Sequence, residues 1–422
     1  MLLNSWYDFP ENSDFSIYNL PYGIFSYGTK PPRVGVAVGN EILDLFRLEV
    51  AGFFDDIDFS TTNLFLGPNL NLFMEEGYEV WNKVRKRVTE ILTSTTDLGV
   101  KLRDDDGLRI ASFIPQDEAT MYLPVEIGDY TDFYSSKEHA TNVGIMFRGK
   151  DNALMPNWLH IPIAYHGRAS SVVVSGTDLR RPMGQINNNN TIPKFESSGR
   201  VDFELEMAFL IGGKGNKLGD RIDIKDAEKH IFGMVVMNDW SARDIQRWEY
   251  QPLGPFGSKN MGTLISPWVV SMEALEPFRV AGPKQDPEPL PYLQLEGNNS
   301  FDINLELSIQ TNEMEEPFVL SKTNHKYLYW NIFQQLTHHT VTGCNIKSGD
   351  LMASGTISGP TKDSYGSMLE LAWKGDNPIE LPSGEKRVFL KDGDRITITG
   401  YCEKEGRRVG FGEVTGKVLP AH

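Results

Sequence analysis

The sequence predicts a mainly β protein with some α-helix, made of a small N-terminal domain, residues 1–118, and one large mixed, β-dominated domain, residues 119–422. Three observations lead to this prediction. Short apolar runs separated by turn residues in the N-terminal part are typical of the strands of a small barrel or roll. Alternating apolar and polar residues near the C-terminus indicate half-buried strands. A chain of 422 residues is long enough for two or three domains of about 150 residues each.

The predicted N-terminal domain contains a few strands and one helix. Apolar runs bounded by turn signals predict strands at 21–28, 34–39 and 41–45. Apolar residues at helical spacing predict one amphipathic helix at 80–92. Polar residues at 93–99 and 103–107 are typical of turns, so these stretches are expected to form the linker to the second domain.

The large domain is expected to be rich in strands, with two helices that stand out. Clear alternation predicts strands at 395–401 and 409–418. A helix is predicted at 241–249, with Ser241 as its N-cap and Asp244 completing a weak capping box. A second helix is predicted at about 326–337 from its apolar stripe, and the asparagine run at 187–190 is expected to be a loop.

Composition excludes several classes of function. The net charge of −16 argues against a nucleic-acid partner, because phosphate binding requires a basic surface. The sequence contains no run of 18 apolar residues that could cross a membrane, and we expect no secretory signal at the N-terminus. Cys344 and Cys402, far apart and without metal-ligand spacing, are expected to be reduced core residues of a cytoplasmic protein. An anionic substrate would need positive charge within the site itself.

The run F-E-L-E-M-A-F at 203–209 places two glutamates in an apolar strand. Side chains alternate along a strand, so Glu204 and Glu206 should lie on one face while Phe203, Leu205 and Met207 lie on the other. One interpretation is the solvated face of an edge strand. The other is a pair of carboxylates that binds a cation, because two like charges so close repel each other unless positive charge lies between them.

Two aspartates also have apolar neighbours. Asp132, in the aromatic stretch 128–139, is either a turn residue or a ligand, and Asp129 fits a turn better. Asp239 ends the apolar run 234–237 just before the predicted helix, where it could cap the helix or face a ligand.

Several basic and polar residues have both a structural and a functional interpretation. His139 follows two serines and could be a surface or capping residue, or a base. Arg243 and Gln246 share a helix face that is either exposed or part of a site. Lys259 lies in the glycine-rich loop 251–263, where a solvated lysine is the commoner case, although small neighbours allow close approach to a ligand.

Together these residues predict a hard-cation site. Four acids with apolar neighbours supply oxygen ligands, and no cysteine or clustered histidine has zinc-ligand spacing. Oxygen-only ligands favour Ca²⁺ or Mg²⁺. The carboxylate pair at 204 and 206 would then be tolerated because a divalent ion lies against it.

Seven motifs, in order along the chain, resemble the fumarylacetoacetate hydrolase family over its full length. They are G-D-Y-T-D-F-Y-S-S-K-E-H-A-T-N-V-G-I-M-F-R-G-K, Y-H-G-R-A-S-S, R-R-P-M-G-Q, F-E-L-E-M-A, M-N-D-W-S-A-R-D-I-Q, P-L-G-P-F and A-S-G-T-I-S-G-P. The resemblance implies a homodimer whose chain has an SH3-like N-terminal barrel and a C-terminal mixed β-sandwich roll. It also implies hydrolysis of a carbon–carbon bond in 4-fumarylacetoacetate, giving fumarate and acetoacetate, the final step of tyrosine and phenylalanine breakdown.

The resemblance further implies roles for individual residues. The Ca²⁺ ligands would be Asp132, Glu204, Glu206 and Asp239. A second site, for Mg²⁺, would be bordered by Asp239, Lys259 and Thr263. His139 would be the general base, oriented by Glu370, and the oxyanion would face Arg243, Gln246 and Lys259. The diketo-diacid substrate would be held by Tyr134, Arg148, Tyr165, Gln246, Tyr250 and Thr356. One departure is Ser258, where glycine or alanine is expected.

These groups suit the chemistry of β-diketone cleavage. A histidine held by a carboxylate can activate water near neutral pH, and a dication can act as a Lewis acid on the diketone oxygens. Fixed donors would stabilise the oxyanion, and Arg148 would supply local positive charge. Two alternatives stay open: a related metal-dependent enzyme that acts on an acylpyruvate or catalyses hydration, decarboxylation or isomerisation, and a metal-stabilised β-protein that acts only as a binding module.

Overall fold

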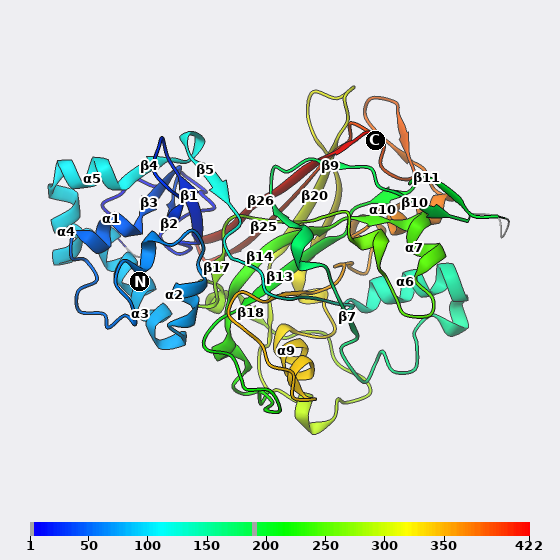
Figure 1. The fold of residues 1–422 in the computed structure, drawn as a ribbon, viewed down its shortest axis with the longest axis horizontal. Helices are drawn as coiled ribbons and strands as arrows, with labels where there is room; N and C mark the ends of the chain where they lie inside the picture. The colour runs from blue at the N-terminus through cyan, green and yellow to red at the C-terminus, as the bar shows by residue number, and fades with distance from the viewer. Residues whose placement is uncertain (1–3, 188–191) are drawn as a thin grey trace.

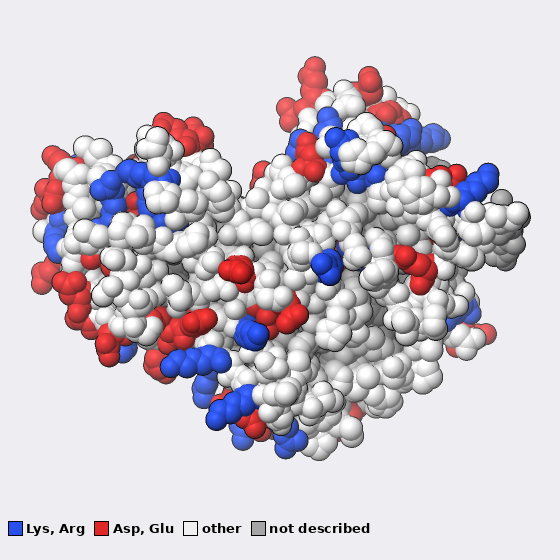
Figure 2. Space-filling model, viewed as in Figure 1, with Lys and Arg blue, Asp and Glu red and all other residues white. Residues whose placement is uncertain are grey.

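The computed structural model describes residues 4–187 and 192–422, so most of the asparagine run at 187–190 lies outside the described residues. Strands form the framework, as expected, and helices surround it. Figure 1 shows the N-terminal part, in blue and cyan, at one end of the molecule, and two large, curled sheets in the remainder. Acidic side chains gather on the N-terminal part in the face that Figure 2 shows, in keeping with the net charge of −16.

The N-terminal part is built on a five-stranded antiparallel sheet with the strand order β4-β3-β2-β1-β5. Its strands are β1 Tyr22–Ser26, β2 Arg33–Val38, β3 Glu41–Asp44, β4 Phe113–Pro115 and β5 Thr120–Tyr122. The first three confirm the predicted strands. Turn residues separate them, and every residue of β2 is buried.

Five helices pack around this sheet: α1 Leu45–Val50, α2 Asn71–Glu75, α3 Tyr78–Leu92, α4 Asp97–Asp104 and α5 Asp106–Ser112. Helix α3 confirms the predicted helix. The prediction of a linker at 93–99 and 103–107 is wrong, because polar residues in both stretches cap helices. Thr96 Oγ1 accepts a hydrogen bond from Gly99 N at 3.0 Å, and Asp105 Oδ1 accepts one from Leu108 N at 2.9 Å. Threonine and aspartate favour helix N-caps as well as turns.

The larger part contains a sheet of eight strands, in the order β7-β6-β22-β13-β14-β16-β8 with β17 also paired to β14. The bounds are β6 Tyr130–Phe133, β7 Ala164–His166, β8 Val172–Val174, β13 Leu205–Ile211, β14 Ile231–Asp239, β16 Thr263–Ile265, β17 Val270–Ser271 and β22 Leu351–Ala353. Strand β13 lies between β14 and β22, so the interpretation of 203–209 as an edge strand is wrong.

A second sheet of five strands, β21-β20-β25-β26-β9, packs against the first. Its strands are β9 Leu179–Arg180, β20 Asn304–Gln310, β21 Phe318–Asn324, β25 Arg395–Lys404 and β26 Arg407–Leu419. Strands β25 and β26 confirm the two alternating runs. The sheets approach closely at Gly400, where an added Cβ would lie 3.0 Å from side-chain atoms of Leu305 and Val236. One large apolar cluster fills the space between the two sheets.

Short two-stranded ladders and five helices complete the large part. The ladders pair β10 Met183–Ile186 with β11 Lys194–Ser197, β12 Val201–Asp202 with β15 Ser241–Ala242, β18 Arg279–Val280 with β19 Ser300–Phe301, and β23 Ile379–Glu380 with β24 Lys386–Arg387. The helices are α6 Lys137–Arg148, α7 Arg243–Glu249, α8 Met272–Leu275, α9 Ile332–Thr340 and α10 Met368–Leu371.

Two predicted helix starts are wrong. Ser241 lies in β15, opposite Asp202, and α7 begins at Arg243 without a side-chain cap. The other helix, α9, begins at Ile332 rather than 326, because Asn331 and Gln334 form a full capping box there. Asparagine at the N-cap satisfies amides that would otherwise lack partners, and this local signal outweighs the apolar stripe further upstream.

The acidic residues and an apolar core share one face of the eight-stranded sheet. Alternate residues on β13, β14 and β22 pack into the core of the N-terminal part, among them Ala208, Val235 and Leu351. The backbone of Tyr22 pairs with Val269 and locks the two parts together. Two acids lie further along the same face: Glu204, just before β13, and Asp239, at the end of β14. The N-terminal part therefore covers one end of this face, and the acids lie at the other end.

Two further expectations concern the whole chain. Among the described residues, no helix combines the length and the apolar character that crossing a bilayer requires. Both cysteines are unpaired; Cys402 is a core residue as expected, whereas Cys344 is only partly buried, because it lies in an irregular connection after α9.

The buried His325 predicts how stability depends on pH. Burial lowers its pKa from 6.5 to about 4, so at pH 5 the unfolded chain binds a proton that the native chain does not. Stability should therefore fall as pH falls below 6.5. Between pH 7.5 and pH 5, wild type should lose about 2 kcal/mol more than His325→Phe in equilibrium urea unfolding. Equal losses in the two proteins would contradict the buried, neutral imidazole.

Candidate active site

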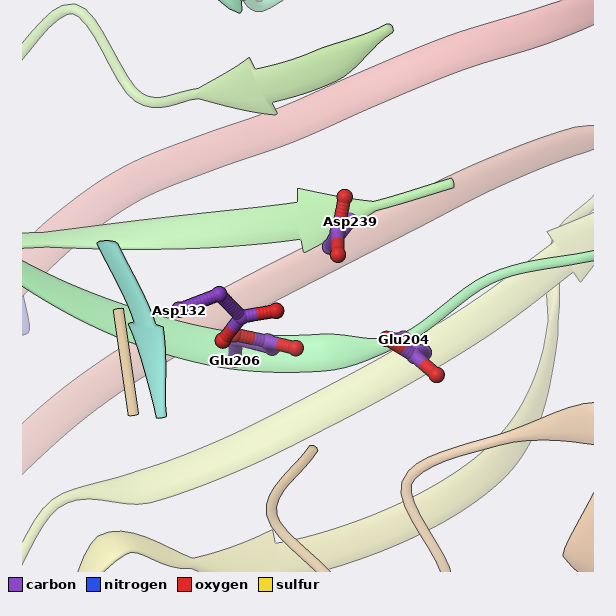
Figure 3. Close-up of side chains that lie close together, drawn as sticks. All are labelled: Asp132, Glu204, Glu206 and Asp239. Atoms are coloured by element: carbon purple, nitrogen blue, oxygen red, sulfur yellow. The ribbon is translucent and has the colours of Figure 1, made fainter. Parts of the chain in front are cut away.

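Four carboxylates converge at the end of the sheet face that the N-terminal part does not cover. Three come from strands, and the fourth comes from the residue just before a strand. Asp132 lies on β6, Glu206 on β13 and Asp239 at the end of β14, while Glu204 immediately precedes β13. One carboxylate oxygen from each lies within 4.8 Å of one from every other, and all four residues are buried. Figure 3 shows the side chains of Asp132 and Glu206 close together, with Glu204 further along the same strand.

Strand geometry explains why these residues meet. Glu204 and Glu206 are two residues apart, so their side chains leave the same face, and cross-strand partners share that face too. Asp132 pairs with Tyr165 on β7, and Asp239 pairs with Thr263 on β16. Asp132 is therefore not a turn residue, and Asp239 is not a helix cap. Both of these interpretations are wrong.

Two buried cations hold one side of the cluster. Lys259 Nζ donates to Glu204 Oε2 and, at 2.7 Å, to Asp239 Oδ2. Arg243 Nη1 lies 2.7 Å from Glu204 Oε1. Burial acts to raise the pKa of Glu204, but Lys259 and Arg243 outweigh it and lower this pKa to about 2. The expectation of a solvated loop lysine is wrong, because Lys259 is only 6% exposed.

The other side of the cluster lacks such partners. Asp132 Oδ1 and Glu206 Oε1 are buried oxygens with no hydrogen-bond partner among the described residues. Burial, followed by the neighbouring acids, raises the pKa of both carboxyls well above the usual range. A buried carboxylate oxygen without a donor is costly. These two oxygens indicate that the cluster is built for a group that the protein itself does not supply.

A divalent cation fits this arrangement. If all four acids ionise, their four negative charges outnumber the positive charges of Lys259 and Arg243, and Arg243 is shared with Asp202, so a dication would offset charge that the protein leaves unbalanced. The donors are oxygens, which hard cations prefer. Thr263 Oγ1 donates to Asp239 Oδ1 at 2.9 Å and so orients one of the carboxylates. In the described ranges, 4–187 and 192–422, no other group of three or more acids, histidines and cysteines is placed to hold a metal.

Next to the cluster, a histidine and a carboxylate form a buried pair. His139, in the first turn of α6, lies with its Nδ1 2.7 Å from Glu370 Oε2 on α10. Burial acts to raise the pKa of Glu370, but His139 and the hydrogen bonds from Asn142 and Ser367 lower it below its usual value. His139 is 4% exposed, so the interpretation as a surface residue is wrong.

The remaining predicted residues differ in how closely they approach this centre. Tyr165 OH donates to Asp239 Oδ2 at 3.1 Å, and the Tyr134 ring lies edge-on to His139 at 5.2 Å between centroids. Arg243 Nη1 donates to Gln246 Oε1 at 3.3 Å. Thr356 is buried in the loop after β22.

Two predicted substrate residues lie further out. Arg148 is exposed at the end of α6, where it donates to the carbonyls of Asn152 and Ala153. Tyr250 follows α7 and is 41% exposed. Both lie outside the buried centre and already have hydrogen-bond partners, which for the Tyr250 hydroxyl is Gln251 Nε2 at 2.8 Å.

Sequence reasoning missed four residues that support the site. Asp202 accepts hydrogen bonds from Arg243 Nε at 2.8 Å and from the amides of Met368 and Leu369 at 2.8 and 3.0 Å. No local signal marks it. Glu370 also accepts from Asn142, Ser358 and Ser367.

Two of the four had a detectable local signal. Asn142 lies three residues after His139 on the same helix face. Ser367 and Glu370 match the S-x-x-E capping pattern, and Ser367 Oγ accepts from Glu370 N at 3.3 Å. Ser358 and Asp202 act across long stretches of chain and could be found only in three dimensions.

Comparisons with known proteins identify the family of the chain. Residues 18–124 match the model "Fumarylacetoacetase N-terminal", and residues 130–419 match "Fumarylacetoacetate (FAA) hydrolase C-terminal". The chain belongs to the FAA hydrolase family. It is therefore an enzyme of the hydrolase class, with relatives across animals, plants and amoebae.

Curated members of the family are similar over nearly the full length. The fumarylacetoacetase of Homo sapiens is 56% identical over 413 residues, covering 97% of each chain. That of Dictyostelium discoideum is 52% identical over 425 residues, covering 100% of this chain and 99% of its own. A fumarylacetoacetate hydrolase structure from Exiguobacterium antarcticum, 16% identical, covers 95% of this chain and 99% of its own with a TM-score of 0.52, which supports the fold.

The unpartnered oxygens predict how cation binding responds to mutation. Asp132→Asn and Glu206→Gln should each weaken Ca²⁺ binding at least about 10-fold in calorimetry, because each removes an anionic ligand. In chelator, the same variants should keep or raise the thermal midpoint, because each relieves charge repulsion in the buried cluster.

Asp226→Asn, at a half-exposed acid that pairs with Lys229 outside the cluster, is the control and should change neither quantity. Unchanged Ca²⁺ affinity in both cluster variants would show that these carboxylates do not bind the ion.

Proposed function

We propose that this enzyme hydrolyses the carbon–carbon bond of 4-fumarylacetoacetate to fumarate and acetoacetate, the final step of tyrosine and phenylalanine breakdown. The observation that carries the proposal is the buried His139–Glu370 pair beside a carboxylate cluster fit for a dication. Relatives at 56% and 52% identity over nearly the whole chain, all named fumarylacetoacetase, support the choice of substrate.

His139 is the general base in this proposal. Glu370, ionised because its pKa is lowered, accepts a hydrogen bond from His139 Nδ1–H, which leaves Nε2 free to accept a proton from water. The water oxygen attacks a ketone carbon of the substrate. The bond between that carbon and the neighbouring carbon then breaks, and the departing carbon takes up a proton. Water and the diketone are thereby converted into a carboxylic acid and a ketone.

Three side chains are assigned to the developing oxyanion: Arg243, Gln246 and Lys259. Arg243 Nη2 is buried without a partner among the described residues, so it has a free donor. Lys259 uses two of its three N–H groups, for Glu204 and Asp239, and keeps one. Fixed donors in a dry site stabilise such charge more strongly than water does.

The cation is assigned to the carboxylate cluster as Ca²⁺, held by Asp132, Glu204, Glu206 and Asp239. A second site, for Mg²⁺, is assigned beside Asp239, Lys259 and Thr263. When bound, a dication supplies a Lewis acid for the substrate's oxygen atoms. The protein's own part is to fix the carboxylates: Gly355 N donates to Glu206 Oε2 at 3.1 Å, and Thr263 and Tyr165 hold Asp239.

The substrate has a carboxylate at each end, and the residues assigned to hold it combine hydroxyls, an amide and one cation. They are Tyr134, Arg148, Tyr165, Gln246, Tyr250 and Thr356. Burial raises the pKa of Tyr134 and Tyr165 above the usual tyrosine value, so both stay protonated donors. Arg148 supplies positive charge at the outer edge, where the acidic surface would otherwise repel an anion.

We also propose that the chain forms a homodimer in the cytoplasm. Exposed apolar side chains on and around α7 support self-association, among them Trp248, Leu253 and Phe256, which are 42%, 97% and 70% exposed. Two unpaired cysteines suit a reducing compartment. Light scattering should give twice the 47.6 kDa of one chain, and the mass of a single chain at micromolar concentration would refute the dimer.

The finer architecture follows the same resemblance. We propose an SH3-like barrel for residues 1–118 and a mixed β-sandwich roll for residues 119–422. The five-stranded antiparallel sheet, of which β1 to β4 lie in the first range and β5 just after it, and the two packed sheets of the second range support these descriptions.

The activity is tested by absorbance, because cleavage destroys the conjugated diketone. Wild-type protein should bleach 4-fumarylacetoacetate, and His139→Ala should lower kcat by about 10²-fold or more, since it removes the general base. Ca²⁺ binding should be unchanged in this variant.

His230→Ala, at the opposite end of β14 from Asp239, serves as the matched control and should retain normal turnover. Absence of bleaching by wild type with Ca²⁺ and Mg²⁺ present would refute the proposed substrate. Near-normal turnover by His139→Ala would remove this histidine as the base.

A further inference from the structure

The histidine and the carboxylate of the buried pair come from two helices far apart in sequence. His139 lies in the first turn of α6, whose N-cap Ser136 accepts a hydrogen bond from His139 N at 3.1 Å. Glu370 lies on α10, a four-residue helix capped by Ser367. Each cap fixes the start of its own helix. Neither cap by itself fixes one helix relative to the other.

Ser358 connects the two helix starts. Ser136 Oγ donates to the carbonyl of Ser358 at 3.1 Å, and the amide of Ser358 lies 3.4 Å from the same hydroxyl. The side chain of Ser358 reaches the other helix, with its Oγ 3.0 and 2.9 Å from the two carboxylate oxygens of Glu370. Ser358 is therefore in contact with the cap of the helix that carries the base and with the carboxylate that orients the base.

The hydroxyl proton of Ser358 has one available acceptor. Gly366 N donates to Ser358 Oγ at 2.9 Å, so the oxygen is already an acceptor there and its own proton is left for Glu370. The backbone on both sides is fixed as well. Ile357 N donates to Leu205 O at 2.8 Å, and Gly359 N donates to Ser364 O at 2.8 Å. Ser358 is 0% exposed, so no water competes for its hydroxyl.

The geometry points to a role for this serine: we propose that Ser358 is a positioning residue, which fixes the plane of the Glu370 carboxylate and thereby the direction of the His139 ring. The role rests on the proposed function, in which His139 is the base. A terminal carboxylate torsion is broad and easily rotated. A donor that contacts both oxygens restricts this rotation, so that Oε2 stays 2.7 Å from His139 Nδ1.

Two other donors, Asn142 on α6 and Ser367 at the N-cap of α10, also hold the Glu370 carboxylate. Asn142 and Ser367 each contact a single carboxylate oxygen, Oε1 and Oε2 respectively. Ser367 belongs to the same short helix as Glu370 and moves with it. Ser358 alone among these donors also contacts the cap of α6, through Ser136.

The kinetic test compares Ser358→Ala with Ser266→Ala. Ser266 is equally buried and also makes hydrogen bonds, to Phe411 O and from Trp268 N, but lies outside the site. Ser358→Ala should lower kcat by about 10- to 100-fold, as expected when a catalytic group is misplaced, and leave KM within about twofold. Ser266→Ala should leave both constants near the wild-type values.

A double-mutant cycle separates positioning from general loss of packing. If Ser358 acts through Glu370, Ser358→Ala should lower kcat far less in a Glu370→Gln background than in wild type. The same fold-loss in both backgrounds would overturn the proposal. If Ser358→Ala fails to fold, Ser358→Cys retains most of the volume with a weaker donor and should show the same pattern.

A spectroscopic readout does not depend on the substrate. The proton between His139 Nδ1 and Glu370 should give a downfield proton NMR signal that is absent in His139→Ala. This signal should be present in Ser266→Ala and shifted or broadened in Ser358→Ala. An unchanged signal in Ser358→Ala would overturn the positioning role, even if wild type does not cleave 4-fumarylacetoacetate and the proposed function fails separately.

Discussion

An excess of buried negative charge at one end of a sheet face is the constraint on which the site depends. Asp132, Glu204, Glu206 and Asp239 bring their buried carboxylates together, and among the described residues Lys259 and Arg243 form ion pairs with this cluster. Both cations lie at Glu204, so the imbalance is concentrated at Asp132 and Glu206. Such an arrangement is unfavourable in isolation. A bound dication would offset part of this excess, so the charge of the cluster suits a divalent cation.

The fold determines where the buried negative charge lies. One face of the eight-stranded sheet is apolar where the N-terminal part covers it, at Ala208, Val235 and Leu351. It turns acidic where that cover ends. The opposite face packs throughout against the second sheet, through residues such as Leu205 and Met207. The N-terminal part therefore covers one end of this face, and the acidic cluster lies at the other end.

Local patterns predicted much of this arrangement, and long-range contacts account for what they missed. Alternation along 203–209 was enough to place Glu204 and Glu206 on one face, and the end of an apolar run located Asp239 at a strand end. The capping threonine and aspartate at 96 and 105 were mistaken for linker residues, because the same side chains favour turns and helix starts. The role of Asp202 could not be predicted from local sequence, because its partners at 368 and 369 lie 166 and 167 residues away.

The acidic cluster and the His139–Glu370 pair are connected through two residues, Asp202 on a strand and Ser358 in a loop. Asp202 holds Arg243, which faces the acidic cluster, and also the first amides of α10, which carries Glu370. Ser358 connects α10 to the cap of α6, which carries His139. A displacement of Arg243 would therefore be transmitted through the Asp202 carboxylate to α10 and from there to the imidazole. Because buried, hydrogen-bonded carboxylates tolerate little rearrangement, binding at the cluster and orientation of the base are expected to change together rather than independently.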